Sequence, residues 1–149
     1  MGELNFPKDL AMSQIGVEKV KKYFESKGYK VTLNHDYRFD MTIESPTGWK
    51  NTIEMKEDIK TEVTGNVAIE FECRGKLSGI KVTEANLWVQ RIHSTRDYIK
   101  EYIITVEKLK KLIAEKKHRG IGDGGDPGSH SKVYLFYEDV FVSYCTELK

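Results

Sequence analysis

Residues 40–56 read Asp-Met-Thr-Ile-Glu-Ser-Pro-Thr-Gly-Trp-Lys-Asn-Thr-Ile-Glu-Met-Lys, a pattern typical of two strands joined by a tight turn. Ser45-Pro46-Thr47-Gly48 supplies the turn, because proline presets its own φ and glycine accepts a positive one. On both sides of it, apolar and polar residues alternate with the period of two that places successive side chains on opposite faces of a strand. The stretch therefore predicts two neighbouring strands, residues 37–44 and 50–58.

This alternation also sorts the charged side chains of the two strands. Asp40 lies on the polar face of the first strand, and Glu54 and Lys56 point together on the polar face of the second. Because the connection between the strands is short, Asp40 and Glu54 are expected to converge. Two carboxylates suit a hard cation such as Mg²⁺ or Mn²⁺, and a neighbouring ammonium can stabilise growing negative charge. The pattern favours metal-assisted hydrolysis of a phosphodiester.

Asp40, thirteen intervening residues and then Glu54-Met55-Lys56 resemble the D…ExK signature of the PD-(D/E)XK nuclease superfamily. The resemblance covers roughly residues 14–74, and Phe39 stands where the family's name has proline. A helix followed by this hairpin resembles the small members, including archaeal Holliday-junction resolvases and phage nucleases. The resemblance implies a restriction-endonuclease-like α/β fold, with Asp40, Glu54 and the Met55 backbone carbonyl binding the metal and Lys56 acting on the attacking water.

Two further acids are candidates for the same site. In the resembling proteins a glutamate of the first helix often joins the metal site, and Glu18 is the candidate here, with Gln14 one turn earlier on the same helix. The alternative for Glu18 is a surface acid among lysines. Glu70 lies on the polar face of a later strand and is either a further metal or water ligand or a solvated carboxylate.

The remaining elements follow from periodicity and from turn residues. Val17, Val20 and Phe24 recur at helical spacing and predict a first helix over residues 10–27. Thr83 can cap a helix that continues to about residue 92. We also predict strands over 29–33, 66–74 and 98–105, a helix over 106–117, a glycine-rich loop over 120–130 and a strand or hairpin over 132–144. This order predicts one domain, residues 1–149, with a mixed sheet flanked by helices.

Composition excludes several classes of protein. Hydrophobic residues make up 39% and charged residues 32%, as in ordinary globular domains. The apolar runs are too short to span a bilayer, so no membrane partner is expected. Residues 1–10 lack the pattern of a secretory signal, which predicts a cytoplasmic protein. Cys73 and Cys145 are far apart in sequence and have no zinc-ligand spacing, so they are expected to be buried apolar residues.

The formal net charge of +1 does not by itself indicate a nucleic-acid partner. The positive charge is concentrated on the helix over 106–117 and on the residues after it, as expected of a surface that tracks phosphates. A solvated lysine-rich helix is the alternative, because Glu107 and Glu115 are interspersed. The candidate nucleic-acid-binding residues are Lys110, Lys111, Lys116, Lys117, His118 and Arg119.

These observations together predict a Mg²⁺- or Mn²⁺-dependent nuclease, with DNA as the expected substrate on the resemblance alone. Cutting both strands of a duplex needs two sites, which a homodimer would supply. One alternative is a nuclease-like DNA-binding module that has no catalytic activity. A second alternative is a structural or regulatory protein with a fortuitous ExK, which predicts no cluster of acids around Asp40 in the folded chain.

Overall fold

The computed structural model of this chain describes residues 2–34, 38–124, 128 and 130–149, with side chains described from residue 11 onward. The helices are α1 (Gly2–Ser26), α2 (Thr61–Thr64), α3 (Val106–Ala114) and α4 (Glu138–Ser143), with a 3₁₀ turn η1 (Gly79–Lys81). The strands are β1 (Lys30–Leu33), β2 (Met41–Glu44), β3 (Lys50–Asp58), β4 (Asn66–Cys73), β5 (Lys76–Leu77), β6 (Leu87–His93), β7 (Ile99–Thr105), β8 (Gly120–Gly124), β9 (Ser131–Tyr137) and β10 (Thr146–Glu147).

The strands form two sheets. Sheet A has the order β1-β2-β3-β6-β7-β10 and is mixed, because β3 and β6 run parallel while the other neighbours are antiparallel. Sheet B has the order β5-β4-β9-β8 and is antiparallel throughout. The predicted mixed α/β fold with flanking helices is confirmed.

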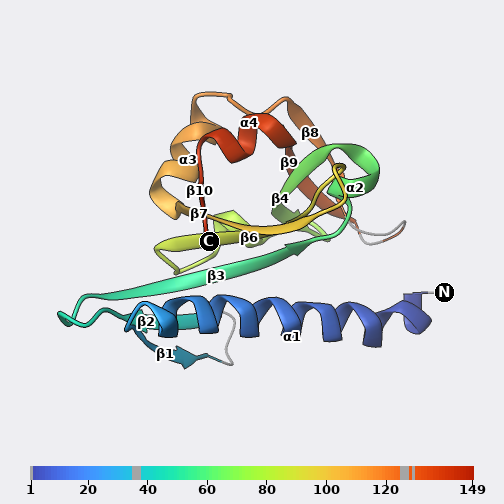
Figure 1. Ribbon diagram of the computed structural model, residues 1–149. Coiled ribbons are helices and arrows are strands. Elements are labelled where there is room, and N and C mark those ends of the chain that lie inside the picture. Colours follow the sequence, from blue (N-terminus) through green and yellow to red (C-terminus); the bar gives the residue numbers. More distant parts are fainter. Residues whose placement is uncertain (1, 35–37, 125–127, 129) are drawn as a thin grey trace.

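One face of sheet A is covered by α1, which runs along it beneath β3 in Figure 1. Val20 and Phe24 of the helix pack in a buried cluster with Ile43, Ile53 and Val89 of the sheet. Near the middle of the helix Gly16 permits a close approach, since an added Cβ would lie 2.8 Å from Glu57 Oε1. The odd-numbered residues of β3 from Ile53 therefore face α1, and the even-numbered ones face away from it.

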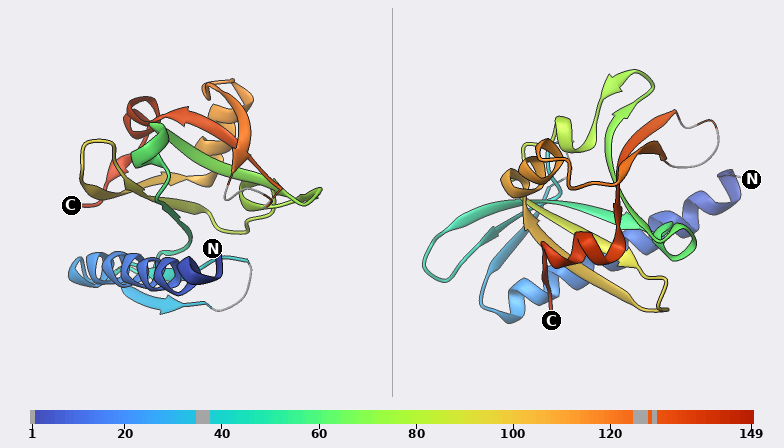
Figure 2. Two further views of the ribbon diagram at one scale, coloured as in Figure 1. Left: turned by 90° about the vertical axis from the view of Figure 1, so that its right-hand side faces the viewer. Right: turned by 90° about the horizontal axis from the view of Figure 1, so that it is seen from above.

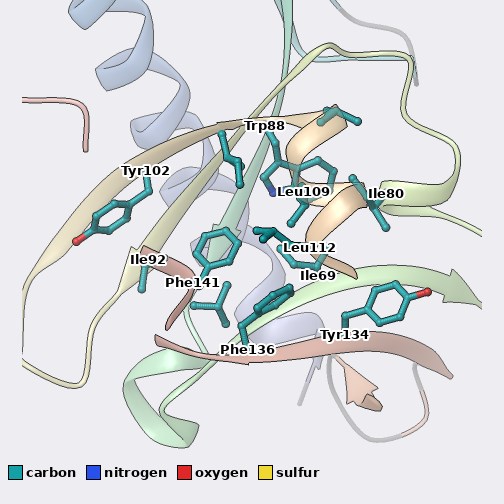
Figure 3. Close-up of a cluster of buried hydrophobic side chains, with 13 residues drawn as sticks. Ile69, Ile80, Trp88, Ile92, Tyr102, Leu109, Leu112, Tyr134, Phe136 and Phe141 are labelled. Atoms are coloured by element: carbon teal, nitrogen blue, oxygen red, sulfur yellow. The ribbon is translucent and has the colours of Figure 1, made fainter. Parts of the chain in front are cut away.

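The other face of sheet A packs against the second layer of the molecule, which consists of sheet B, α3 and α4 (Figures 1 and 2). Figure 3 shows the core between them, where Trp88 and Ile92 of β6 meet aliphatic and aromatic side chains from α3, β9 and α4. The fully buried members include Val67, Ile69, Trp88, Ile92, Leu109, Phe136 and Phe141. This is the layer toward which Glu54 and Lys56 point.

The predicted helix over 83–92 is wrong, because this segment contributes the strand β6. β6 lies between β3 and β7, and both its faces are covered: Val89 packs in the α1 cluster and Trp88 packs in the second core. A strand buried on both faces loses the alternation of apolar and polar residues, so its spacing can match that of a helix.

The glycine-rich segment also differs from its prediction. Residues 120–124 form β8 at the edge of sheet B, where sequence predicted a loop. The segment predicted as a strand or hairpin over 132–144 divides into β9 and α4. The strands predicted over 29–33, 50–58, 66–74 and 98–105 are confirmed as β1, β3, β4 and β7, whereas β2 begins at Met41, and residues 35–37 lie outside the described part.

The first helix is longer than predicted and begins at Gly2, whereas α3 ends at Ala114 rather than at residue 117. None of the described helices has the length and apolar character needed to cross a membrane. Cys73 and Cys145, which the sequence predicted to be buried, are only partly buried.

Candidate active site

Asp40 lies where β2 begins to pair with β3. Its N–H donates to the Ile53 carbonyl over 2.8 Å, and the pairing of Met41 with Ile53 places Asp40 opposite Glu54. Beyond this point β3 has no β2 residue beside it, and the Met55 N–H donates instead to Asp40 Oδ2 over 2.6 Å. The N–H and C=O of one strand residue point to the same side. The Met55 carbonyl therefore also points to the side on which Asp40 lies.

Glu54 is the most strongly perturbed carboxyl group of this site. Its side chain is 13% exposed, and burial raises its pKa to about 7. The Lys56 ammonium works against this shift, while the negative charge of Asp40 and a side-chain hydrogen bond with Asp40 add to it. Below about pH 7 the Glu54 carboxyl group thus retains its proton, which must leave before Glu54 can bind a cation.

Lys56 follows on the same face of β3, with its Nζ 3.7 Å from Glu54 Oε2. The side chain is 39% exposed, and the ammonium lies 6.0 Å from the centre of the Trp88 ring. The Lys56 side chain thus stays partly accessible while its ammonium contacts the Glu54 carboxylate. This is the position from which a lysine can reach an anion bound beside Asp40 and Glu54.

Thr83 completes the surroundings of Glu54, a contact that sequence reasoning missed. Its hydroxyl donates to Glu54 Oε1 over 3.1 Å and accepts from the Ala85 N–H over 3.2 Å. The segment is held over the sheet because the Glu84 N–H donates to the Arg38 carbonyl. The sequence predicted Thr83 only as the cap of a helix, because no local pattern shows that residues 83–86 cross the polar face of β3.

The site can be tested for its fit to a divalent cation. Within the described residues no three His, Cys, Asp or Glu side chains gather as a metal site. A cation would therefore be held by Asp40, Glu54, the Met55 carbonyl and water, an all-oxygen set in which Mg²⁺ keeps several waters. The fit is favourable, because a cation between the carboxylates removes the repulsion that contributes to the raised pKa of Glu54.

The structure does not bring Glu18 to this site. Gly16 and Val20 of α1 face sheet A, while Glu18 is exposed on the opposite side of the helix. The helix also packs on the Ile53 face of β3, whereas Glu54 points to the other face. Gln14 is exposed as well.

Glu70 comes closer to the site than Glu18 does. It lines a cleft of about 300 Å³ that Lys56 also lines. In the part of the chain that is described, however, Glu70 forms no shared group of metal ligands with Asp40 and Glu54. Its place is on the wall of the cleft, beyond Lys56.

The predicted basic surface is divided in the structure. Four of its side chains are exposed on α3 and in the turn after it: Lys110, Lys111, Lys116 and Lys117. His118 instead packs edge-on against the core, with its ring 5.0 Å from that of Tyr134. Arg119 lies on sheet B, where it donates to Asn66 Oδ1 over 3.1 Å and stacks 4.6 Å from the Tyr137 ring. Binding of nucleic acid by these residues stays a prediction.

The structure thus brings together Asp40, Glu54, the Met55 backbone and Lys56, the four elements of the site on which the sequence resemblance rests. Comparison of the chain with protein-family models, with curated proteins and with solved structures gives no match.

Proposed function

We propose that this chain is a metal-dependent nuclease that hydrolyses phosphodiester bonds of DNA. The observation that carries the proposal is the convergence of the Asp40 and Glu54 carboxyl groups on one face of β3, with the Lys56 ammonium 3.7 Å from Glu54. A buried carboxyl group with a perturbed pKa and a specific charged partner is found most often at a functional site. The resemblance to the PD-(D/E)XK superfamily supports the same reading, from the same residues.

Each residue has a role that follows from its position. Asp40 and Glu54 would hold Mg²⁺ or Mn²⁺, and the hydrogen bond from Thr83 orients the Glu54 carboxylate. The bound cation would polarise a phosphate oxygen and lower the pKa of a water molecule. Lys56 would donate to a phosphate oxygen or to the attacking water, so that negative charge growing on the phosphate is stabilised without a covalent enzyme intermediate.

A cleavage assay tests the proposal. The parent chain is incubated with linear duplex, single-stranded and branched DNA, and with RNA, in Mg²⁺, in Mn²⁺ or in chelator. We expect cutting with either cation and none with chelator, because the carboxylates alone cannot polarise a phosphate. Glu54→Gln keeps the shape of the side chain and an acceptor for Thr83 but removes the charge, and it should abolish cutting.

Glu62→Gln is the matched control, since Glu62 is an exposed carboxylate of α2, and it should cut like the parent. Cutting in chelator, or equal cutting by Glu54→Gln, would contradict the proposal. DNA binding without cutting in any cation would favour the non-catalytic DNA-binding module.

A further inference from the structure

Sheet B meets sheet A at a corner beside the candidate active site. The edge of β4 is tied to sheet A at Ala68, whose N–H donates to Asp58 Oδ2 over 3.0 Å and whose carbonyl accepts from Gln90 Nε2 over 3.2 Å. The cleft of about 300 Å³ occupies this corner. Lys56 lines its sheet A side, and Glu70 and Val133 line its sheet B side.

One face of sheet B is packed in the core and the other opens from this corner. Ile69 and Phe136 point into the core, so by the period of two their neighbours along β4 and β9 point to the opposite side. We call this side the open face. By register it consists of Asn66, Ala68, Glu70, Val133, Leu135, Tyr137, Gly120, Gly122 and Gly124.

The glycines of β8 contribute no side chains to the open face. A Cβ added to Gly122 would lie 2.8 Å from Leu135 Cδ1, and one added to Gly124 would collide with Val133 Cγ1. The β9 side chains thus lie over bare β8 backbone, which any larger residue would prevent. On this surface Val133 is buried beside the cleft, and Tyr137, at the other end of β9, is exposed.

At the far end of the open face, Arg119 stacks on Tyr137, with the guanidinium 4.6 Å from the ring centre. Tyr137 is 54% exposed. One N–H of Arg119 is used by Asn66, and within the described residues its guanidinium forms no ion pair with a carboxylate. An exposed ring beside a guanidinium is suited to stacking a nucleobase and binding the adjoining phosphate.

The charges of the corner suit the same ligand. Lys56 and Lys60 line the cleft and Arg119 lies at the end of the open face. Of the acids that line the cleft, Glu57 is paired with Arg91, Asp58 is buried and accepts from Ala68 and Gln90, and Glu70 is the third. Lys56 is paired with Glu54, so Arg119 is the cation that the open face itself presents. From Val133 to Tyr137 the distance along β9 is about 13 Å at the usual rise of a strand, so the two positions are separate contacts on one extended ligand.

We propose that an unpaired polynucleotide strand lies across the open face, with a base stacked on Tyr137, a phosphate on Arg119 and its backbone entering the cleft toward Lys56. The proposal rests on the proposed function and narrows its substrate to nucleic acid with a single-stranded segment. A duplex is excluded from this path because stacking on Tyr137 requires an unpaired base.

Binding to labelled oligonucleotides tests the proposal, measured by fluorescence anisotropy in the Glu54→Gln background, where no cutting occurs. The probes are a 12-nucleotide DNA strand, the same sequence as RNA, and the corresponding DNA duplex. We expect tighter binding of the single strands than of the duplex. Tyr137→Ala and Arg119→Ala should each raise the Kd for a single strand by about 10-fold, as removal of a stacking side chain does.

Two matched variants serve as controls. Trp49→Ala removes a side chain that is 76% exposed at the β2–β3 turn, and Lys27→Ala removes a cation 5.5 Å from the Tyr23 ring on α1. Both residues lie away from the open face and should leave the Kd unchanged. Equal Kd values for all four variants, tighter binding of duplex, or no binding by the parent would overturn the proposal.

A small phosphodiester, bis(p-nitrophenyl) phosphate, separates this proposal from the proposed function. It needs only the residues around Glu54, so the parent with Glu54 intact should hydrolyse it in Mn²⁺ whether or not the open face binds a strand. If the parent hydrolyses this compound but Tyr137→Ala and Arg119→Ala leave the Kd for the oligonucleotide unchanged, only the open-face proposal is overturned. Binding that depends on Tyr137 and Arg119, without hydrolysis, would overturn only the nuclease assignment.

Discussion

Replacing Lys56 with alanine is expected to lower kcat for phosphodiester cleavage by about 10²–10³-fold, the loss typical of removing one preorganised group that stabilises transition-state charge. Lys56 is also the cation that lowers the pKa of Glu54. Without it the pKa of Glu54 should rise above about 7, so the remaining activity should need a higher pH. The measurement is the pH profile of kcat for the parent and the variant.

Lys100→Ala is the matched control for this change. Lys100 has the same 39% exposure as Lys56 and a similar carboxylate partner, with its Nζ 3.5 Å from Glu147 Oε1. It lies on β7 and is paired with Glu147 rather than with Glu54, so its removal should leave kcat and the pH profile unchanged. If Lys56→Ala behaved as Lys100→Ala does, Lys56 would have no part in the chemistry.

The largest expected loss of stability comes from Arg91→Ala. Arg91 is 3% exposed under α1, where its guanidinium lies 2.9 Å from Glu57 Oε2 and 3.2 Å from Glu101 Oε2. Its removal would take the cation from Glu101 and leave Glu57 beside the His93 ring, a change that costs about 3–5 kcal/mol of unfolding free energy. For a chain of this size the melting temperature should fall by roughly 10 °C.

Arg96→Ala is the comparison for an ion pair that is exposed to solvent. Arg96 Nη2 lies 3.1 Å from Asp139 Oδ1, but the two side chains are 63% and 72% exposed. Pairs of this kind contribute about 0–1 kcal/mol, so the variant should unfold close to the parent in a urea titration. Similar losses for the two variants would mean that the Glu57–Arg91–Glu101 cluster does not stabilise the packing of α1 on sheet A.

The central hairpin could be predicted from sequence because its information is local. The turn at Pro46 and Gly48 fixes which strands are neighbours, and the period of two fixes which side chains share a face. These two facts suffice to bring Asp40 next to Glu54 and to align Lys56 with Glu54. The hydrogen bond from the Met55 N–H to Asp40 follows from the same register.

The contacts that sequence could not predict depend on how distant segments stack. Which face of sheet A receives α1 decides that Glu18 lies away from Glu54, and either face is compatible with the apolar stripe of the helix. Thr83 reaches Glu54 only because the chain crosses β3 after η1. The glycines of β8 predict a loop from sequence alone. In the structure they form a strand, because the side chains of Leu135 and Val133 occupy the space that larger residues would need.

The most direct test of the central claim, that Asp40 and Glu54 share one divalent cation, is a calorimetric titration of Mn²⁺ into the parent and Asp40→Asn at pH 6 and pH 8. We expect one site in the parent, bound about tenfold more tightly at pH 8, because Glu54 with its pKa raised to about 7 must lose a proton before it can bind a cation. Asp40→Asn should lose this binding at both pH values. Binding that is absent from the parent, or that survives in Asp40→Asn, would contradict the claim.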